Sequence, residues 1–94
     1  MKIVWSRRAI RHLVHVREYV EKESEKGASR IAGRILEAVD VLRDHPDMGR
    51  PGRLPGTREL VVPGTAYVIP YRVRGERLEL IAVFHGRQKW PGKL

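Results

Sequence analysis

The segment VEKESEKGASRI (residues 20–31) joins two helical patterns and decides how the chain can fold. Neither glycine nor proline interrupts the residues from Ser6 to Lys26. We expect Gly27 to end the first helix, because glycine readily adopts the left-handed conformation found after a helix C-terminus. The second helix then begins almost at once, at about Ala28. With so short a connection, the two helices are predicted to fold back as an antiparallel hairpin.

Apolar side chains recur at helical spacing on both sides of this junction. Ser6 is a predicted N-cap, and the first helix is expected to run to about Ser24. Its apolar stripe is formed by Ala9, Leu13, Val16 and Val20. The second helix is expected over Ala28–Asp44, with a stripe formed by Ile31, Ile35, Val39 and Leu42. Each pattern predicts an amphipathic helix with one buried face.

The remaining apolar segments have the short, alternating character of strands. Strands are expected at Lys2–Trp5, Thr57–Val62, Ala66–Val73 and Arg77–His85. Residues 45–56 hold three prolines and three glycines and are expected to form a loop. In the last strand one face is expected to carry Leu78, Leu80, Ala82 and Phe84, and the other Arg77, Glu79 and His85.

The order of elements predicts one α+β domain over residues 1–94. Its architecture is β-α-α-β-β-β, with the helical hairpin packed on one face of an antiparallel sheet that the N-terminal strand joins. Pro70 does not fit a central strand because it lacks a backbone N–H donor. We therefore expect a bulge or a local break in the sheet at Pro70.

Composition restricts the possible functions. The 94 residues contain no cysteine and carry a net charge of +8. The absence of cysteine excludes thiolate catalysis and is typical of a reducing compartment, so a cytoplasmic location is expected. The apolar start, MKIVW, is too short for a signal peptide or a membrane span. The positive charge favours polyanionic partners such as nucleic acid or an acidic protein surface.

The histidines offer little evidence of a catalytic or metal site. His12 and His15 are three residues apart on a helix, but no carboxylate at matching spacing joins them, so they are expected to be exposed. His45 is expected at a helix terminus. His85 ends a strand beside Arg87, where it could transfer protons or serve as a strand-end hydrogen-bonding residue. No metal or cofactor is predicted.

The C-terminal stretch VFHGRQKWPGKL (residues 83–94) combines cationic and aromatic side chains. Arg87, Lys89 and Trp90 could form a recognition surface, with Trp90 stacking on a base or a protein. Alternatively, Trp90 covers an open end of the core. The composition alone favours neither alternative.

The segments HPDMGRPGR, GTRELVV, YVIPYRV and HGRQKWP, after two N-terminal helices, resemble the RelE/ParE superfamily of type II toxin–antitoxin toxins. The resemblance extends from Trp5 to Pro91. It implies a toxin that a cognate antitoxin neutralises in a hetero-oligomer, with operator DNA bound only through the antitoxin. The expected antitoxin-binding residues are Arg7, Arg11, Arg58 and Arg72.

The superfamily has two branches with different targets. RelE-like members cleave mRNA on the ribosome, and ParE-like members inhibit DNA gyrase. Ribonucleases of this family place a phosphate-binding arginine where Val68 stands here, and valine cannot stabilise a phosphorane. Arg72 shares a face with Val68 but lies about 13 Å further along the strand.

This departure favours the gyrase branch. The expected target-binding residues are Arg72, His85, Arg87, Lys89 and Trp90. In the ribonuclease alternative, His85, Arg87 and Lys89 would supply acid–base and phosphate-neutralising groups.

Overall fold

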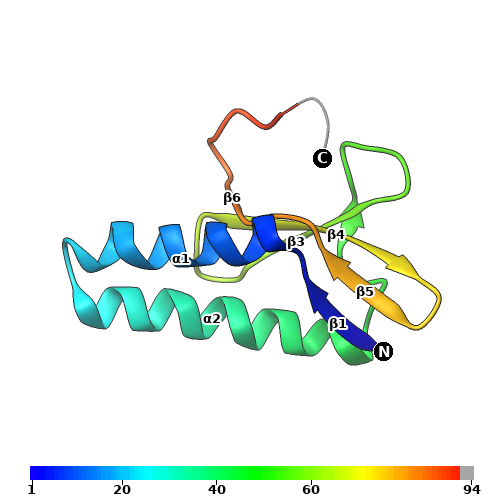
Figure 1. Cartoon of the computed structure of the whole chain (residues 1–94), viewed down its shortest axis with the longest axis horizontal. Coiled ribbons are helices and arrows are strands. Elements are labelled where there is room, and N and C mark those ends of the chain that lie inside the picture. Colours follow the sequence, from blue (N-terminus) through cyan, green and yellow to red (C-terminus); the bar gives the residue numbers. More distant parts are fainter. Residues whose placement is uncertain (92–94) are drawn as a thin grey trace.

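A computed structural model describes residues 1–91 of the chain. Two helices, α1 (Arg7–Glu21) and α2 (Glu25–Asp44), pack as an antiparallel hairpin against one face of a β-sheet (Figure 1). The strands are β1 (Lys2–Trp5), β2 (Arg50–Pro51), β3 (Arg58–Val61), β4 (Tyr67–Arg74), β5 (Arg77–Leu80) and β6 (Phe84–His85). The predicted α+β class and the β-α-α-β-β-β order are confirmed, with β2 added inside the predicted loop.

The helical hairpin turns earlier than the sequence predicts. Gly27 does not end α1; it lies in the first turn of α2 and is buried. Ser24 is the N-cap of α2, and its Oγ accepts a hydrogen bond from the Gly27 N–H at 2.9 Å. A Cβ at Gly27 would lie 3.4 Å from Val20 Cγ1 and 3.3 Å from the Ser24 side chain. Glycine is therefore favoured here because it lets the two helices approach closely.

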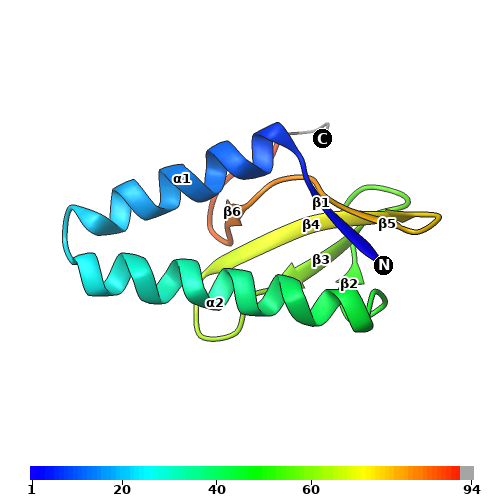
Figure 2. The same cartoon turned by 60° about the horizontal axis from the view of Figure 1, so that its bottom comes forward.

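The sheet has the strand order β1-β5-β4-β3-β2, with β6 pairing with β4 beyond the end of β5 (Figure 2). The neighbours of β4 are antiparallel, as expected. The N-terminal strand joins the sheet as predicted, and β1 pairs parallel to β5, with Lys2 opposite Arg77. The crossover from β1 to β5 contains the helical hairpin, which accounts for the parallel pairing.

The core lies between the helices and the helix-facing side of β4. Ile69 and Tyr71 are fully buried there, among Ile35, Val39 and Leu42 of α2. The Tyr71 hydroxyl donates to the Pro46 carbonyl at 2.7 Å and accepts the Gly49 N–H at 2.9 Å. These bonds fix the long loop to the sheet.

The sheet breaks where proline was expected to break it. Pro70 stands opposite Glu59 of β3, while on its other side the pairing partner changes from β5 to β6. Tyr71 pairs with Leu80, but Val68 pairs with Phe84, so the register slips by one residue across residues 81–83. This slip is the signature of a β-bulge, and it confirms the prediction at Pro70.

The slip overturns the expected faces of the last strand. Because side chains alternate, a one-residue slip moves the residues beyond it to the opposite faces. Leu78, Leu80 and Val83 belong to the main core cluster, whereas Phe84 stacks on Trp90 with ring centroids 4.8 Å apart. The prediction of one continuous strand with Leu80 and Phe84 on a shared face is therefore wrong.

Side chains of α1 and its N-cap form hydrogen bonds with backbone groups that have lost their partner strand at the break in the sheet. The Ser6 hydroxyl donates to the Ile81 carbonyl at 2.8 Å, and the Val83 N–H donates to His12 Nδ1 at 3.1 Å. The expectation that His12 is an exposed helix residue is wrong, since its ring is half-buried against Phe84. Burial, followed by the charges of Arg8 and Arg11, lowers the pKa of His12.

Two smaller predictions concern the helix ends. Ser6 is the N-cap of α1, because its side chain accepts the Ala9 N–H at 2.9 Å. His45 is the C-cap of α2, as expected. Among residues 1–91, no helix is both long enough and apolar enough to cross a membrane.

Candidate functional site

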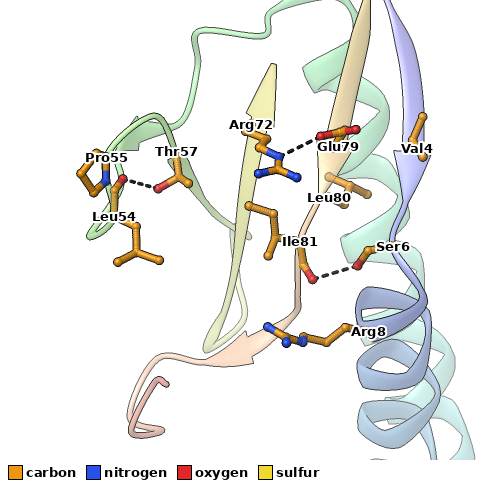
Figure 3. Close-up of a pocket in the computed structure, with 10 residues that line it drawn as sticks. All are labelled: Val4, Ser6, Arg8, Leu54, Pro55, Thr57, Arg72, Glu79, Leu80 and Ile81. Atoms are coloured by element: carbon orange, nitrogen blue, oxygen red, sulfur yellow. Dashed lines mark hydrogen bonds and ion pairs between the residues drawn. The ribbon is translucent and has the colours of Figure 1, made fainter. Parts of the chain in front are cut away.

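A pocket of about 460 Å³ lies on the sheet face that the helical hairpin leaves open. We call this side of the sheet the open face. The 54–57 segment forms one wall of the pocket, and Val4 of β1 stands on the other side (Figure 3). Arg72 and Glu79 come from β4 and β5, and Arg8 extends from the first turn of α1. The pocket therefore lies where three separate parts of the chain meet.

The pocket has an excess of positive charge. Arg72 Nε donates to Glu79 Oε1 at 2.8 Å, and Arg74 Nε lies 3.6 Å from the same oxygen. The hydrogen bond from Arg72 lowers the pKa of Glu79, which keeps it ionised. Within residues 1–91, Arg8 has no ion-pair partner. The pocket thus holds one carboxylate against the guanidinium groups of Arg8 and Arg72, with Arg74 beside it, and the surface can attract an anionic partner.

A buried carboxylate fixes the loop beside this pocket. Glu59 is only 3% exposed, yet it stands on the open face of β3. It accepts a hydrogen bond from Arg50 Nη2 at 3.0 Å and another from the Arg53 backbone N–H at 2.9 Å. Burying a carboxylate is costly unless it is paired and hydrogen-bonded, and both conditions are met here. Glu59 therefore holds the loop in position.

Trp90 packs against the protein itself. The Arg53 guanidinium carbon lies 3.6 Å from the centroid of the Trp90 ring, and Phe84 contacts the ring. The C-terminal segment thus crosses toward the loop on the open face (Figure 1). Among the described residues 1–91, the buried Trp90 Nε1–H has no hydrogen-bond partner. Of the two predicted roles for Trp90, this packing supports the one that covers apolar surface.

His85 lies on the opposite side of the sheet from Arg72. It pairs in register with Tyr67, whose side chain packs on the helix-facing core, and the two rings meet edge to face at 5.6 Å. Its Nδ1 accepts the Arg87 N–H at 3.1 Å. The structure therefore does not bring His85 and Arg72 together. Arg87 and Lys89 are exposed in the turn and the segment that follow β6.

The four predicted antitoxin-binding arginines lie at three separate places. Arg7 and Arg11 are exposed on α1. Arg58 donates to the Gly49 carbonyl at 2.8 Å and lies near Asp47, so it is held by the loop. Arg72 lines the open-face pocket. Only a partner that extends around the molecule could contact all of them.

The chemistry available in the open-face pocket follows from its lining, in which Glu79 is the one carboxylate and Arg8 and Arg72 are the cations. Arginines can hold phosphate or carboxylate groups, but residues lining the pocket include no histidine or tyrosine for proton transfer. Val68, which shares a face with Arg72, is buried. In the described part of the chain, no three metal-ligating side chains come together.

Sequence reasoning missed Arg8 and Glu59. Arg8 lies in the first turn of α1, two residues after the N-cap Ser6 and close to the end of the first strand. That position was a usable signal. No comparable signal exists for Glu59, because the sequence pattern does not distinguish an acidic residue that faces solvent in a short strand from one that is buried.

These features define a small basic protein whose sheet presents arginines on an open face. The chain belongs to the family described as the ParE toxin of type II toxin–antitoxin systems, whose model matches residues 3–90.

Individual relatives agree with this assignment. The chain is 43% identical to the Y4kP protein of Sinorhizobium fredii over 96% of this chain and 93% of the relative. It is 32% identical to Toxin RelE2 of Caulobacter vibrioides over 89% of this chain and 93% of that protein. A solved chain of the chromosomal ParDE toxin–antitoxin system from P. aeruginosa is 26% identical. It superposes with a TM-score of 0.81 over 90% of this chain and 95% of its own length.

Proposed function

We propose that this toxin acts in the cytoplasm by inhibiting DNA gyrase, without catalysing a reaction of its own. The observation that carries the proposal is the separation of Arg72 from His85 by the sheet. A ribonuclease needs acid–base groups and a phosphate-binding cation around one scissile bond. An inhibitor that binds its target needs only a complementary surface.

The open-face arginines supply such a surface. Arg8, Arg72 and Arg74 project from two elements with one carboxylate among them, and the remaining positive charge is available to a target. Arg87 and Lys89 add exposed cations on the C-terminal segment. We expect these residues to contribute to target binding, while Trp90 contributes by holding the segment in place.

We also propose that a cognate antitoxin neutralises the toxin by binding as an extended chain. The ParDE relative comes from a toxin–antitoxin system. Arg58 and Arg72 lie on opposite faces of the sheet and Arg7 is exposed on α1, which favours a partner that wraps around the domain. Such a partner would order on binding and present acidic side chains.

Two assays on purified protein test the choice of target. The toxin is added to a gyrase supercoiling reaction and, separately, to a cell-free translation reaction in which message ends are mapped. We expect supercoiling to be inhibited and message to stay intact. Cleavage at defined codon positions with unimpaired supercoiling would contradict the proposal and support the ribosome-dependent mRNA endonuclease instead.

A further inference from the structure

A second cavity, of about 520 Å³, lies between α1 and β6 on the helix-facing side of the sheet. We call it the α1–β6 cleft. Its polar lining comes from α1 on one wall and from the end of the sheet and the turn that follows it on the other. These side chains are Arg11, His12, His15, Tyr67, His85 and Gln88. None of the lining residues is acidic.

Backbone contacts fix the hydrogen-bonding role of two imidazoles in this cleft. His12 Nδ1 accepts the Val83 N–H, and His85 Nδ1 accepts the Arg87 N–H, each at 3.1 Å. A neutral imidazole that accepts at Nδ1 carries its proton on Nε2. Both rings therefore offer an Nε2–H donor.

The other polar groups are also left as donors. Gln88 Oε1 accepts the His85 N–H at 3.3 Å, so the amide nitrogen of Gln88 retains its two donors. Within residues 1–91, Arg11 forms neither an ion pair nor a side-chain hydrogen bond, and a guanidinium can only donate. Donors thus approach the cleft from both of its walls.

We infer that the α1–β6 cleft binds a phosphate group. A ligand here must accept several hydrogen bonds from opposite directions and carry negative charge, because Arg8 and Arg11 place a positive field at His12. A tetrahedral phosphate presents oxygens in all these directions, whereas a carboxylate presents two in one plane. The phosphate could belong to a nucleic-acid backbone or be a free ion. The inference does not depend on gyrase being the target.

The inference can be tested by titrating the intact chain with inorganic phosphate at pH 7. Long-range proton–nitrogen NMR spectra report the imidazole nitrogens of His12 and His85 individually. We expect saturable shifts at both Nε2 atoms. Arg11→Gln should weaken binding about tenfold and leave the fold intact, since Arg11 is exposed and unbonded in the described structure. Arg7→Gln removes the same charge one turn earlier on α1, outside the lining, and should change binding less than twofold.

Competition identifies the source of the phosphate. Displacement of inorganic phosphate by a short single-stranded oligonucleotide would assign the site to a nucleic-acid backbone, and failure to displace it would assign the site to a free phosphate. Absence of saturable shifts, equal binding of acetate, or an equal loss in Arg7→Gln and Arg11→Gln would each overturn the inference.

Discussion

The two halves of β4 carry different surfaces although they belong to one strand. From Tyr71 to Arg74 the strand pairs with β5 and places Arg72 among the cations of the open face. At Tyr67 and Val68 it pairs with β6, and His85 of β6 lies on the helix-facing side of the sheet. The difference arises from one extra residue opposite Pro70. A single step in register thus decides which side chains can act on the same ligand.

The first prediction concerns the support of the open face and has the largest expected effect. Glu59→Gln should lower the free energy of unfolding by about 3 kcal/mol, because it weakens the hydrogen bonds that the carboxylate accepts from Arg50 and the Arg53 backbone N–H. A hydrogen bond to a charged group contributes about 1.5–3 kcal/mol, and the variant leaves no unpaired charge in the interior because Arg50 is half exposed. Urea unfolding measures the change.

Asp40→Asn is the matched control, because it also breaks an arginine–carboxylate pair. Its partner is Arg43, and both side chains are exposed. The expected loss is below about 0.5 kcal/mol. Equal losses in the two variants would show that Glu59 does not hold the loop as its burial indicates.

The second prediction concerns the other half of β4, where α1 caps the break. His12→Ala should cost about 2 kcal/mol of unfolding free energy, because it leaves the Val83 N–H without an acceptor and removes the ring packed on Phe84. His15→Ala changes an exposed histidine on the same helix and should stay within about 0.5 kcal/mol. A loss below 0.5 kcal/mol for His12→Ala would contradict the capping role.

The third prediction is the pH dependence that follows from the same residue. The pKa of His12 is lowered in the fold, so below the ordinary histidine pKa of about 6.5 the unfolded chain binds more protons than the folded one. Stability is therefore fully present above pH 6.5 and falls as the pH drops below it. Between pH 6.5 and 5.5 the loss cannot exceed about 1.4 kcal/mol.

Unfolding curves at several pH values test this dependence. The slope between pH 6.5 and 5.5 should disappear in His12→Ala and persist in His15→Ala. The lowered pKa of Glu79 acts only near and below the ordinary glutamate pKa of about 4.3, so it does not enter this window. Persistence of the slope in His12→Ala would assign it to another group.

Much of the fold follows from local patterns. The amphipathic stripes predicted both helices, Ser6 and His45 occupy the predicted caps, and the missing donor of Pro70 placed the break. Period-two alternation also placed Arg72 and Val68 on one face correctly. These features depend on residues that are neighbours in the sequence.

The rest depends on contacts between distant residues. Residues 80–84, which span the break, are all apolar, so their pattern could not locate the bulge or show that the faces exchange beyond it. The acceptor for the Val83 N–H is His12, 71 residues away. The packing of Trp90 against Arg53 likewise joins a loop and a terminal segment that share no pattern.

The central claim is that the open face inhibits the target without help from His85, and a mutant cycle tests it most directly. The concentration that half-inhibits gyrase supercoiling is measured for Arg72→Ala, His85→Ala and the double variant. We expect a rise of about tenfold for Arg72→Ala, less than twofold for His85→Ala, and a double variant equal to Arg72→Ala. An equal loss in both single variants, with no further loss in the double variant, would place the two residues in one site and contradict the account.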